Sequence, residues 1–326
     1  MRKLFLTVFL AGIMLPAITL AEEKGFSDVP QTHPDYVAIS YLNGEGVIKG
    51  YEDGTFKPDQ LVNRAEALKI ILEGNKASIP AEVTETGFTD VKTADWFAKY
   101  VVAGKTLGII GGNPDGTYAP GREVAKSEFV KILLNANGFK PENWQGKKIY
   151  SDVPADAWFT PYMNYAGQAG LLTADANNNL EPSKQLTRGE VAEIYYLITI
   201  LRKGADNQFL LDQAQSQIAQ IEVYVAGNEL QYAKSASQLG VDLTQQALKN
   251  TPENNVVLGT AKIARAYDYL VNSYISLVRG KTADAKSWAD QAITKASEAW
   301  QANNAIQTTA KHIKDLANAI LNQLPA

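Results

Sequence analysis

The chain has 326 residues, of which 45% are hydrophobic and 20% charged, and its formal net charge is −4. This composition is typical of a folded protein rather than a disordered one, and the length predicts more than one domain. The negative net charge excludes a global positive field that would gather nucleic acid or anionic lipid, so no nucleic-acid partner is expected.

The N-terminal residues predict a secretory signal peptide. A positive start at Arg2 and Lys3 precedes an apolar run over residues 4–20, and Ala21 provides a small residue for cleavage. Cleavage there leaves an exported protein without an integral membrane span. A retained membrane anchor is the alternative, and Pro16 disfavours it because proline interrupts the apolar run.

The sequence contains no cysteine, and its two histidines, His33 and His312, lie far apart. Disulfides and thiolate metal sites are therefore excluded, and a histidine metal cluster or a Ser-His-Asp triad is disfavoured. We interpret both histidines as surface or turn residues. The sequence predicts no metal, no cofactor and no catalytic residue, which favours a binding or scaffolding protein.

Three copies of one motif follow at a constant period. Phe26, Phe88 and Tyr150 open the blocks F-S-D-V, F-T-D-V and Y-S-D-V, and no insertion or deletion interrupts the register. The same step links Gly46, Gly108 and Gly170; Pro58, Pro120 and Pro182; and Glu66, Glu128 and Glu190. Self-similarity at a fixed period predicts three copies of one supersecondary unit, none of which buries its apolar face alone.

Each copy is expected to fold as helix, turn and helix. The first helical segment ends at the glycine of the G-V-I or G-I-I stretch, where a left-handed cap is favoured. A short apolar strand and a turn follow, at Asp53-Gly54 in the first copy, Asp115-Gly116 in the second and Asn177-Asn178 in the third. These dipeptides are interpreted as structural, because they accommodate positive φ at low cost.

The second helix of each copy begins at a capping sequence. Asn63-Arg-Ala-Glu66 and Thr187-Arg-Gly-Glu190 fit a capping box, whereas Ala125 leaves the second copy without a capping side chain. Apolar residues at helical spacing predict a core face: Ala67, Leu68, Ile70 and Ile71; Phe129, Val130, Ile132 and Leu133; Val191, Ile194, Leu197 and Ile198.

A basic residue occupies the first position of each second helix, where the helix dipole disfavours a cation. These residues are Arg64, Lys126 and Arg188. A positive side chain beside free backbone N–H groups can receive an anion. The alternative is an ion pair with a carboxylate of the same copy, such as Asp28, Asp90 or Asp152. The recurrence of the basic residue at an unfavourable place favours the anion receptor.

Taken together, the F-x-D-V block, the D-G-T-F-x-P turn and the T-R-A-E-like box resemble the S-layer homology (SLH) family over about residues 25–203. The resemblance implies a pseudo-threefold unit of helix-loop-helix repeats around a central helical bundle, with glycan bound in grooves between repeats. It also implies non-covalent anchoring to cell-wall polysaccharide, often pyruvylated, or to modified peptidoglycan in some Gram-negative relatives. The expected location is the cell wall or the envelope surface.

The resemblance also implies a set of glycan-binding residues. The basic box residues would meet a glycan carboxylate, less strongly at Lys126 because lysine lacks the planar two-pronged donor. The F-x-D-V aspartates would bond sugar hydroxyls or cap the first helix. Two tryptophans would stack on a sugar or fill the core, and the first repeat has Pro34 instead. The complete set is Arg64, Lys126, Arg188, Asp28, Asp90, Asp152, Trp96 and Trp158.

From residue 204 the sequence becomes rich in alanine, glutamine and asparagine. Apolar residues recur with a heptad-like spacing in three segments, which are separated at residues 250–252 and 279–282. This pattern predicts an antiparallel bundle of three or four helices, suited to spacing, self-association or binding of other envelope proteins. Its near-neutral charge argues against a polyanion partner.

The sequence therefore predicts a mainly α protein. Its expected parts are a signal peptide (1–21), three SLH repeats (22–84, 85–146 and 147–203) and an antiparallel helical bundle (204–326).

Two further functions compete with that of a wall anchor. An envelope enzyme, for instance a glycoside hydrolase, would need two carboxylates flanking a cleft, and Glu222, Glu229 and Glu298 are its candidate acids. Each is more simply interpreted as part of a solvated helix face. A porin-linked anchor would need a separate membrane protein, because the tail lacks the alternating strands of a barrel.

Overall fold

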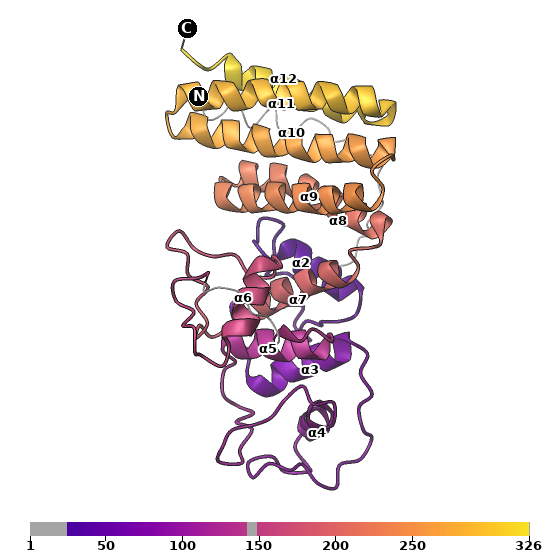
Figure 1. The fold of residues 1–326 in the computed structure, drawn as a ribbon, viewed down its shortest axis with the longest axis vertical. Helices are drawn as coiled ribbons and strands as arrows, with labels where there is room; N and C mark the ends of the chain where they lie inside the picture. The colour runs from indigo at the N-terminus through magenta and orange to yellow at the C-terminus, as the bar shows by residue number, and fades with distance from the viewer. Residues whose placement is uncertain (1–24, 142–148, 326) are drawn as a thin grey trace. The chain divides into compact units, whose positions relative to one another are not determined.

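The computed structural model describes residues 25–141 and 149–325, which belong to two compact units (Figure 1). The repeat unit comprises Gly25–Pro30 and Ala38–Leu201. The helical unit comprises Gln31–Val37 and residues 202–325. The described residues contain eleven α-helices and no β-strand, which confirms the mainly α prediction. The predicted signal peptide lies outside the described residues.

The repeats contribute three pairs of helices. The first helices are α2 (Tyr36–Gly44), α4 (Ala98–Thr106) and α6 (Thr160–Gln168), and the second helices are α3 (Arg64–Gly74), α5 (Lys126–Ala136) and α7 (Arg188–Arg202). The pairs begin at the constant interval that the sequence period predicts. Helix α3 packs against α4 and α5, and α5 packs against α6. Helices of neighbouring repeats are therefore in contact with one another.

The second helices bury most of the apolar face predicted for them. Equivalent positions are buried in all three copies: Ala67, Phe129 and Val191; Leu68, Val130 and Ala192; Ile71, Leu133 and Tyr195; Leu72, Leu134 and Tyr196. Burial of a leucine or isoleucine side chain stabilises a fold by about 1.5–3 kcal/mol relative to leaving it exposed. These positions therefore form the core on which the three copies depend.

The segments that lead into the second helices pair in a closed ring of backbone hydrogen bonds. The amide of Val62 donates to Leu186 O (3.0 Å), that of Val124 donates to Val62 O (2.9 Å) and that of Leu186 donates to Val124 O (3.1 Å). The three side chains have no exposed surface. Because each copy supplies a donor to one neighbour and an acceptor to the other, the buried backbone groups are satisfied only when all three copies are present.

The short strand expected in each repeat is absent, so that prediction was wrong. The amides of Val47 and Ile48 bond back to Leu42 O at the end of α2, and the amide of Tyr51 then donates to Thr55 O (2.8 Å) across a tight turn. The residues between helix and turn thus have local partners and form no ladder. In the described residues, β pairing is limited to three isolated bridges in the central ring.

The predicted turns and caps are confirmed. Gly54 (φ 79°), Gly116 (φ 81°) and Asn178 (φ 62°) are left-handed in the turns. The amide of Glu66 donates to the side chain of Asn63, and the carboxylate of Glu66 accepts from the amide of Asn63, which completes the capping box of α3.

The second copy keeps half of this arrangement. The carboxylate of Glu128 accepts a hydrogen bond from the amide of Ala125 (3.1 Å). The alanine side chain has no oxygen that could accept a hydrogen bond from the amide of Glu128. Helix α7 has both bonds, between Thr187 and Glu190.

The helical unit has five α-helices in its described part, not the three or four expected. They are α8 (Asn207–Ala226), α9 (Leu230–Asn250), α10 (Asn255–Val278), α11 (Thr282–Ala302) and α12 (Gln307–Leu321). The predicted breaks near residues 250 and 280 are confirmed. Two breaks were missed: one follows α8, where Asn228 has φ 63°, and one follows α11, where the Asn303 side chain accepts from the amide of Ala305.

Consecutive helices of this unit pack side by side, and α10 and α11 share the most extensive contact (Figure 1). The contact face of α11 consists of alanines that have no exposed surface: Ala285, Ala289, Ala292, Ala296 and Ala299. Small side chains let the two helix backbones approach closely. Among the helices of the described residues, none has the length and hydropathy needed to cross a bilayer.

Candidate functional site

The basic residue at the start of each second helix reaches into another repeat. Arg64 Nε donates to Tyr118 O (2.9 Å), Lys126 Nζ donates to Leu180 O (2.9 Å) and Arg188 Nε donates to Phe56 O (2.8 Å). The three acceptors occupy equivalent turn positions. These bonds therefore connect the three repeats in a closed cycle, as the backbone bonds of the central ring do. The alternative interpretation, in which the residue pairs with an aspartate of its own repeat, was wrong.

Arg64 is buried and contacts two residues of the second repeat. It is 7% exposed, its Nη1 bonds Glu128 Oε1 (2.9 Å), and its guanidinium lies 4.7 Å from the ring centre of Tyr118. Burial raises the pKa of Glu128, but the hydrogen bond from Arg122 and the charge of Arg64 outweigh it and hold that pKa below its ordinary value. Arg64 therefore connects two repeats through a charged, partly buried network.

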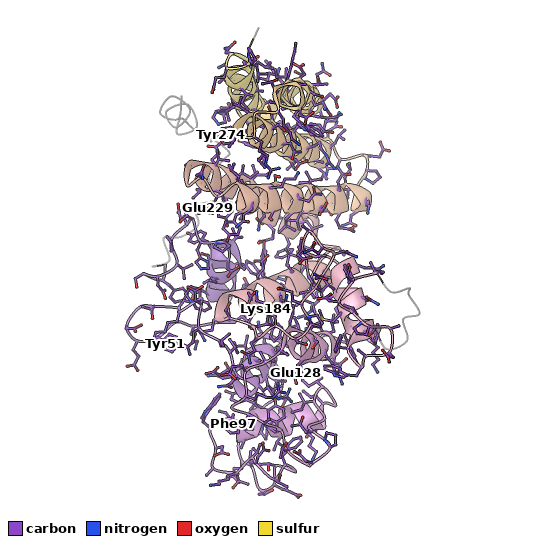
Figure 2. All side chains as sticks on the ribbon, turned by 90° about the vertical axis from the view of Figure 1, so that its left-hand side faces the viewer. Tyr51, Phe97, Glu128, Lys184, Glu229 and Tyr274 are labelled. Atoms are coloured by element: carbon purple, nitrogen blue, oxygen red, sulfur yellow. The ribbon has the colours of Figure 1, made fainter. Side chains whose placement is uncertain are left out.

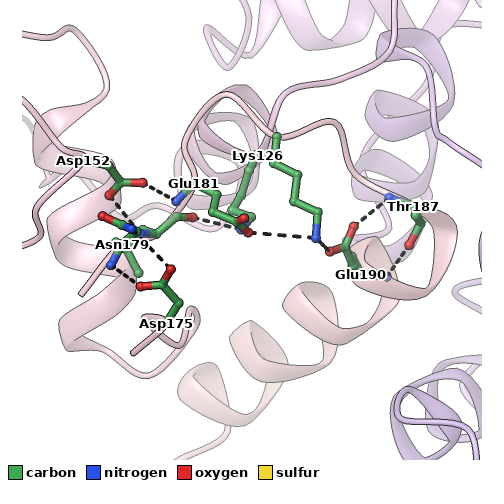
Figure 3. A network of polar contacts seen from close by, with 9 residues as sticks. Lys126, Asp152, Asp175, Asn179, Glu181, Thr187 and Glu190 are labelled. Atoms are coloured by element: carbon green, nitrogen blue, oxygen red, sulfur yellow. Dashed lines mark hydrogen bonds and ion pairs between the residues drawn. The ribbon is translucent and has the colours of Figure 1, made fainter. Parts of the chain in front are cut away.

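The other two basic positions are more open. Arg188 Nη2 donates to Lys49 O (3.1 Å), and its guanidinium lies over the rings of Phe56 (4.5 Å) and Tyr51 (5.0 Å). Lys126 Nζ also contacts the exposed carboxylate of Glu181 (3.3 Å), as Figure 3 shows.

The F-x-D-V aspartates clamp the turn of their own repeat. Asp152 accepts from the amides of Leu180 (2.9 Å) and Glu181 (2.7 Å), as seen in Figure 3, and Asp28 and Asp90 make the equivalent pairs of bonds. The second donor of each pair has positive φ: 58° at Lys57, 55° at Ala119 and 54° at Glu181. The clamp thus holds a non-glycine residue in a strained conformation, and the expected helix-capping role was wrong.

The tryptophans lie at the surface. Trp96 and Trp158 are 53% and 52% exposed, so the alternative that they fill the core was wrong. Each precedes a first helix, and its indole meets the next phenylalanine edge-on, at 5.4 Å between ring centres. About half of each indole side chain is therefore accessible to a ligand.

Lysines from the preceding repeat accompany both tryptophans. Lys69 Nζ of α3 lies 5.7 Å from the ring centre of Trp96. Lys131 Nζ of α5 lies 5.1 Å from that of Trp158 and 5.6 Å from that of Tyr162. These lysines were not among the residues predicted from the sequence. Their recurrence at the period of the repeats was the available signal, but a lone lysine on an amphipathic helix usually indicates only a solvated face.

The two tryptophans belong to equivalent clusters of side chains. The Trp96 cluster contains Trp96, Lys69, Tyr100 and Glu73, and the Trp158 cluster contains the equivalent residues Trp158, Lys131, Tyr162 and Asn135. In the Trp96 cluster the buried Tyr100 hydroxyl donates to the carboxylate of Glu73, and burial together with this bond raises the pKa of Tyr100 to about 12. Each cluster offers an aromatic face beside an ammonium group, which suits a sugar ring bearing an acidic substituent.

The third equivalent position has neither group. Pro34 stands where the other copies have tryptophan, and Glu193 stands where they have lysine. The carbonyl of Pro34 accepts a hydrogen bond from Tyr224 (3.0 Å), and both residues belong to the helical unit.

Two acidic residues of the tail have partners within the helical unit. Glu222 is mostly buried and contacts His312 Nε2 (3.0 Å) and the Tyr267 hydroxyl (3.3 Å), so the interpretations of Glu222 as a solvated residue and of His312 as a surface residue were wrong. Hydrogen bonds from Lys262 and Lys295 lower the pKa of Glu298.

The third acid, Glu229, precedes α9 (Figure 2). Within residues 25–141 and 149–325, no group of three or more His, Cys, Asp or Glu residues is arranged to hold a metal ion.

Comparison with known proteins assigns the repeats. Residues 25–68, 87–130 and 149–192 each match the S-layer homology domain. The S-layer protein EA1 of Bacillus anthracis is 27% identical over 65% of this chain, and Cell surface glycoprotein 1 of Acetivibrio thermocellus is 32% identical over 41%. An amylopullulanase of Thermoanaerobacterium thermosulfurigenes is 29% identical over 53%. These matches span 23%, 6% and 9% of the respective relatives.

Proposed function

Because this chain carries three tandem S-layer homology domains and S-layer proteins are among its relatives, we propose that it binds cell-wall glycan non-covalently through its repeat unit. The ligand is a wall polysaccharide or modified peptidoglycan, and the site of action is the wall or envelope surface. The observation that carries this proposal is the pair of half-exposed tryptophans, Trp96 and Trp158, each beside a lysine of the preceding repeat.

The chemistry of the two clusters fits an acidic sugar. The apolar face of a pyranose ring stacks on an indole. A carboxylate on the sugar meets the lysine ammonium as a charge-assisted hydrogen bond, which is stronger than a bond between neutral groups. The lysines come from α3 and α5 and the tryptophans from the following repeats, so each site needs two adjacent repeats in register.

The remaining candidate residues stabilise the fold of the repeat unit. Arg64, Lys126 and Arg188 fasten one repeat to another, and Asp28, Asp90 and Asp152 hold the turns. Direct contact of these six residues with glycan stays a prediction. The guanidinium of Arg188 also lies over the ring of the exposed Tyr51.

We propose that the helical unit serves as a spacer or as an assembly domain of the protein that the repeats anchor to the wall. It presents long helices and no described metal cluster, and its partners would be other envelope proteins or a second copy of the chain. Its alanine seam is already buried within the unit, so any such partner meets a different face.

Binding of the full chain to isolated sacculi tests the proposed function. Co-sedimentation is measured with native sacculi and with sacculi from which secondary polysaccharide has been removed. Binding that is lost with the polysaccharide identifies that polymer as the ligand, and binding that persists identifies peptidoglycan. Failure to bind either preparation would contradict wall anchoring.

An envelope enzyme is the second candidate, because amylopullulanase and an exoglucanase are among the relatives. In this chain Glu222 and Glu298 are engaged by His312 and by two lysines, respectively. Zymography on purified wall distinguishes the candidates, because an anchor leaves the wall intact and an enzyme clears it.

A further inference from the structure

The two tryptophan clusters share a half-exposed tryptophan beside a lysine, and they differ at the residue one turn after that lysine. Helix α3 places Glu73 one turn after Lys69, whereas α5 places Asn135 one turn after Lys131. Residues four apart lie on the same face of a helix, so each of these side chains neighbours its lysine. In the part of the chain that the structure describes, the Trp96 cluster therefore has a carboxylate one turn after its lysine and the Trp158 cluster has an amide there. A second lysine, Lys99, lies 5.2 Å from the ring centre of Tyr100.

Glu73 is fixed at its site. The Tyr100 hydroxyl donates to its carboxylate, and Tyr100 itself is buried against the indole of Trp96, with ring centres 6.3 Å apart. Glu73 is otherwise exposed to solvent. A ligand stacked on Trp96 thus meets a negative charge held close to the lysine that would attract it.

We propose that the two clusters select different sugars: the Trp158 cluster binds the carboxylated units of the glycan, and Glu73 directs the Trp96 cluster to uncharged units. This inference rests on the proposed function, because it assumes that both clusters bind glycan. Its chemical basis is that a like charge near the ligand carboxylate disfavours binding, whereas a neutral amide at Asn135 donates to or accepts from a sugar without that repulsion.

The third equivalent position extends the same series. Glu193 reverses the charge found at Lys69 and Lys131, and Pro34 removes the aromatic face. A position with a carboxylate and no indole has neither of the groups that hold an acidic sugar. The chain is thus expected to bind two sugar units, one of each kind, at the two tryptophan clusters.

The test uses two matched probes on the full chain. One is a methyl N-acetylhexosaminide bearing a pyruvate ketal, and the other is the same sugar as its uncharged methyl ester. The indole N–H resonances of Trp96 and Trp158, assigned with Trp→Phe variants, report each site separately. We expect the acid to bind the Trp158 cluster about tenfold more tightly than the Trp96 cluster, a ratio that corresponds to a single nearby like charge. The ester is expected to show no such preference.

Reciprocal variants test the cause. Glu73→Asn is expected to raise the affinity of the Trp96 cluster for the acid to that of the Trp158 cluster, and Asn135→Glu to lower that of the Trp158 cluster about tenfold. Tyr100→Phe removes the hydrogen bond to Glu73 and keeps the charge, so it is expected to preserve the preference.

The outcomes separate the two claims. If both indoles respond to the acid with the same affinity, or if Glu73→Asn changes nothing, the selectivity inference is overturned while the proposed sites stand. If neither indole responds to either sugar, the inference fails together with the proposed sites, and binding to sacculi then shows whether wall anchoring itself survives.

Discussion

Arg188, in the third repeat, donates a hydrogen bond of 2.8 Å from Nε to the carbonyl oxygen of Phe56, in the first. The bonds from Arg64 to Tyr118 and from Lys126 to Leu180 are its equivalents, so the three together close a ring around the repeat unit. A chain of open-ended repeats would leave one such donor without its acceptor. Closure explains why the motif occurs three times, because each copy completes the backbone and side-chain bonding of another.

Replacing Arg64 tests its part in this ring. Arg64→Ala removes the bonds to Tyr118 and Glu128 and leaves a half-buried carboxylate with one partner fewer. We expect the free energy of unfolding of the repeat unit to fall by about 2–3 kcal/mol, since charged hydrogen bonds contribute in this range. Urea denaturation followed by near-UV circular dichroism measures the change.

Arg122→Ala is the matched control for this substitution. Arg122 also bonds Glu128, but its side chain is 45% exposed, so its loss is expected to cost under about 1 kcal/mol. Equal effects of the two substitutions would show that the contact between repeats adds no stability beyond an ordinary surface ion pair.

The aspartate clamp makes a second prediction. Asp90→Ala removes both acceptors that hold the turn, while Ala119 keeps φ at 55°. We expect a loss of about 1–3 kcal/mol. Adding Ala119→Gly is expected to restore about 1 kcal/mol of it, because glycine adopts positive φ without a steric penalty. The clamp account would be refuted by a glycine that destabilises the Asp90→Ala protein further.

The capping glutamates predict a dependence of stability on pH. Burial raises the pKa of Glu190, but the hydrogen bonds from Lys184 and Thr187 outweigh it and lower that pKa, and Glu128 has its pKa lowered in the same sense. A carboxylate with a lowered folded-state pKa stabilises the fold above the unfolded pKa, and this contribution disappears as the pH falls through the folded value.

The repeat unit should therefore lose stability as the pH drops below about 4.5, the ordinary glutamate pKa. Thermal unfolding of the wild type and of Glu128→Gln, compared between pH 7 and pH 3, measures this loss. The glutamine variant is expected to start less stable and to change less with pH. An identical pH profile for both proteins would exclude Glu128 as a contributor.

The alanine seam of the helical unit predicts an effect confined to that unit. Ala292→Leu adds three carbon atoms where α11 packs closely on the neighbouring helices, and overpacking of this kind costs about 1–3 kcal/mol. Wall binding should be unchanged, because the proposed sites lie in the repeats. Differential scanning calorimetry and sacculus co-sedimentation on the same variant check both expectations, and a parallel loss of binding would contradict the second.

Much of the repeat unit could be predicted because its determinants are local. The fixed period, the glycine after each first helix and the box around Asn63 or Thr187 depend on neighbouring residues, and the structure confirms them. The partner of Arg64 could not be predicted. Tyr118 belongs to the following copy, and a repeated sequence is consistent with a contact inside one copy or between two.

The tail was harder to predict for the same reason. The break after α8 depends on a left-handed Asn228, a residue type that also occurs inside the tail's helices. Glu222 was interpreted as solvated because a single acidic residue in an amphipathic segment gives no sign that His312 and Tyr267 cover it from two other helices. Exposure of Trp96 and Trp158 likewise depends on tertiary packing, which the sequence pattern leaves open.

One comparison tests the central claim most directly: co-sedimentation of the full chain with native sacculi for the double variant Trp96→Ala/Trp158→Ala and for Trp300→Ala. Trp300 is 37% exposed and has Lys314 at 5.2 Å, so it is a tryptophan–lysine pair of the same kind outside the repeats. We expect the double variant to lose at least about tenfold in wall affinity, since two stacking contacts are removed, and Trp300→Ala to bind like the wild type. Wild-type binding by the double variant would contradict the assignment of the glycan sites to the repeat unit's tryptophan clusters.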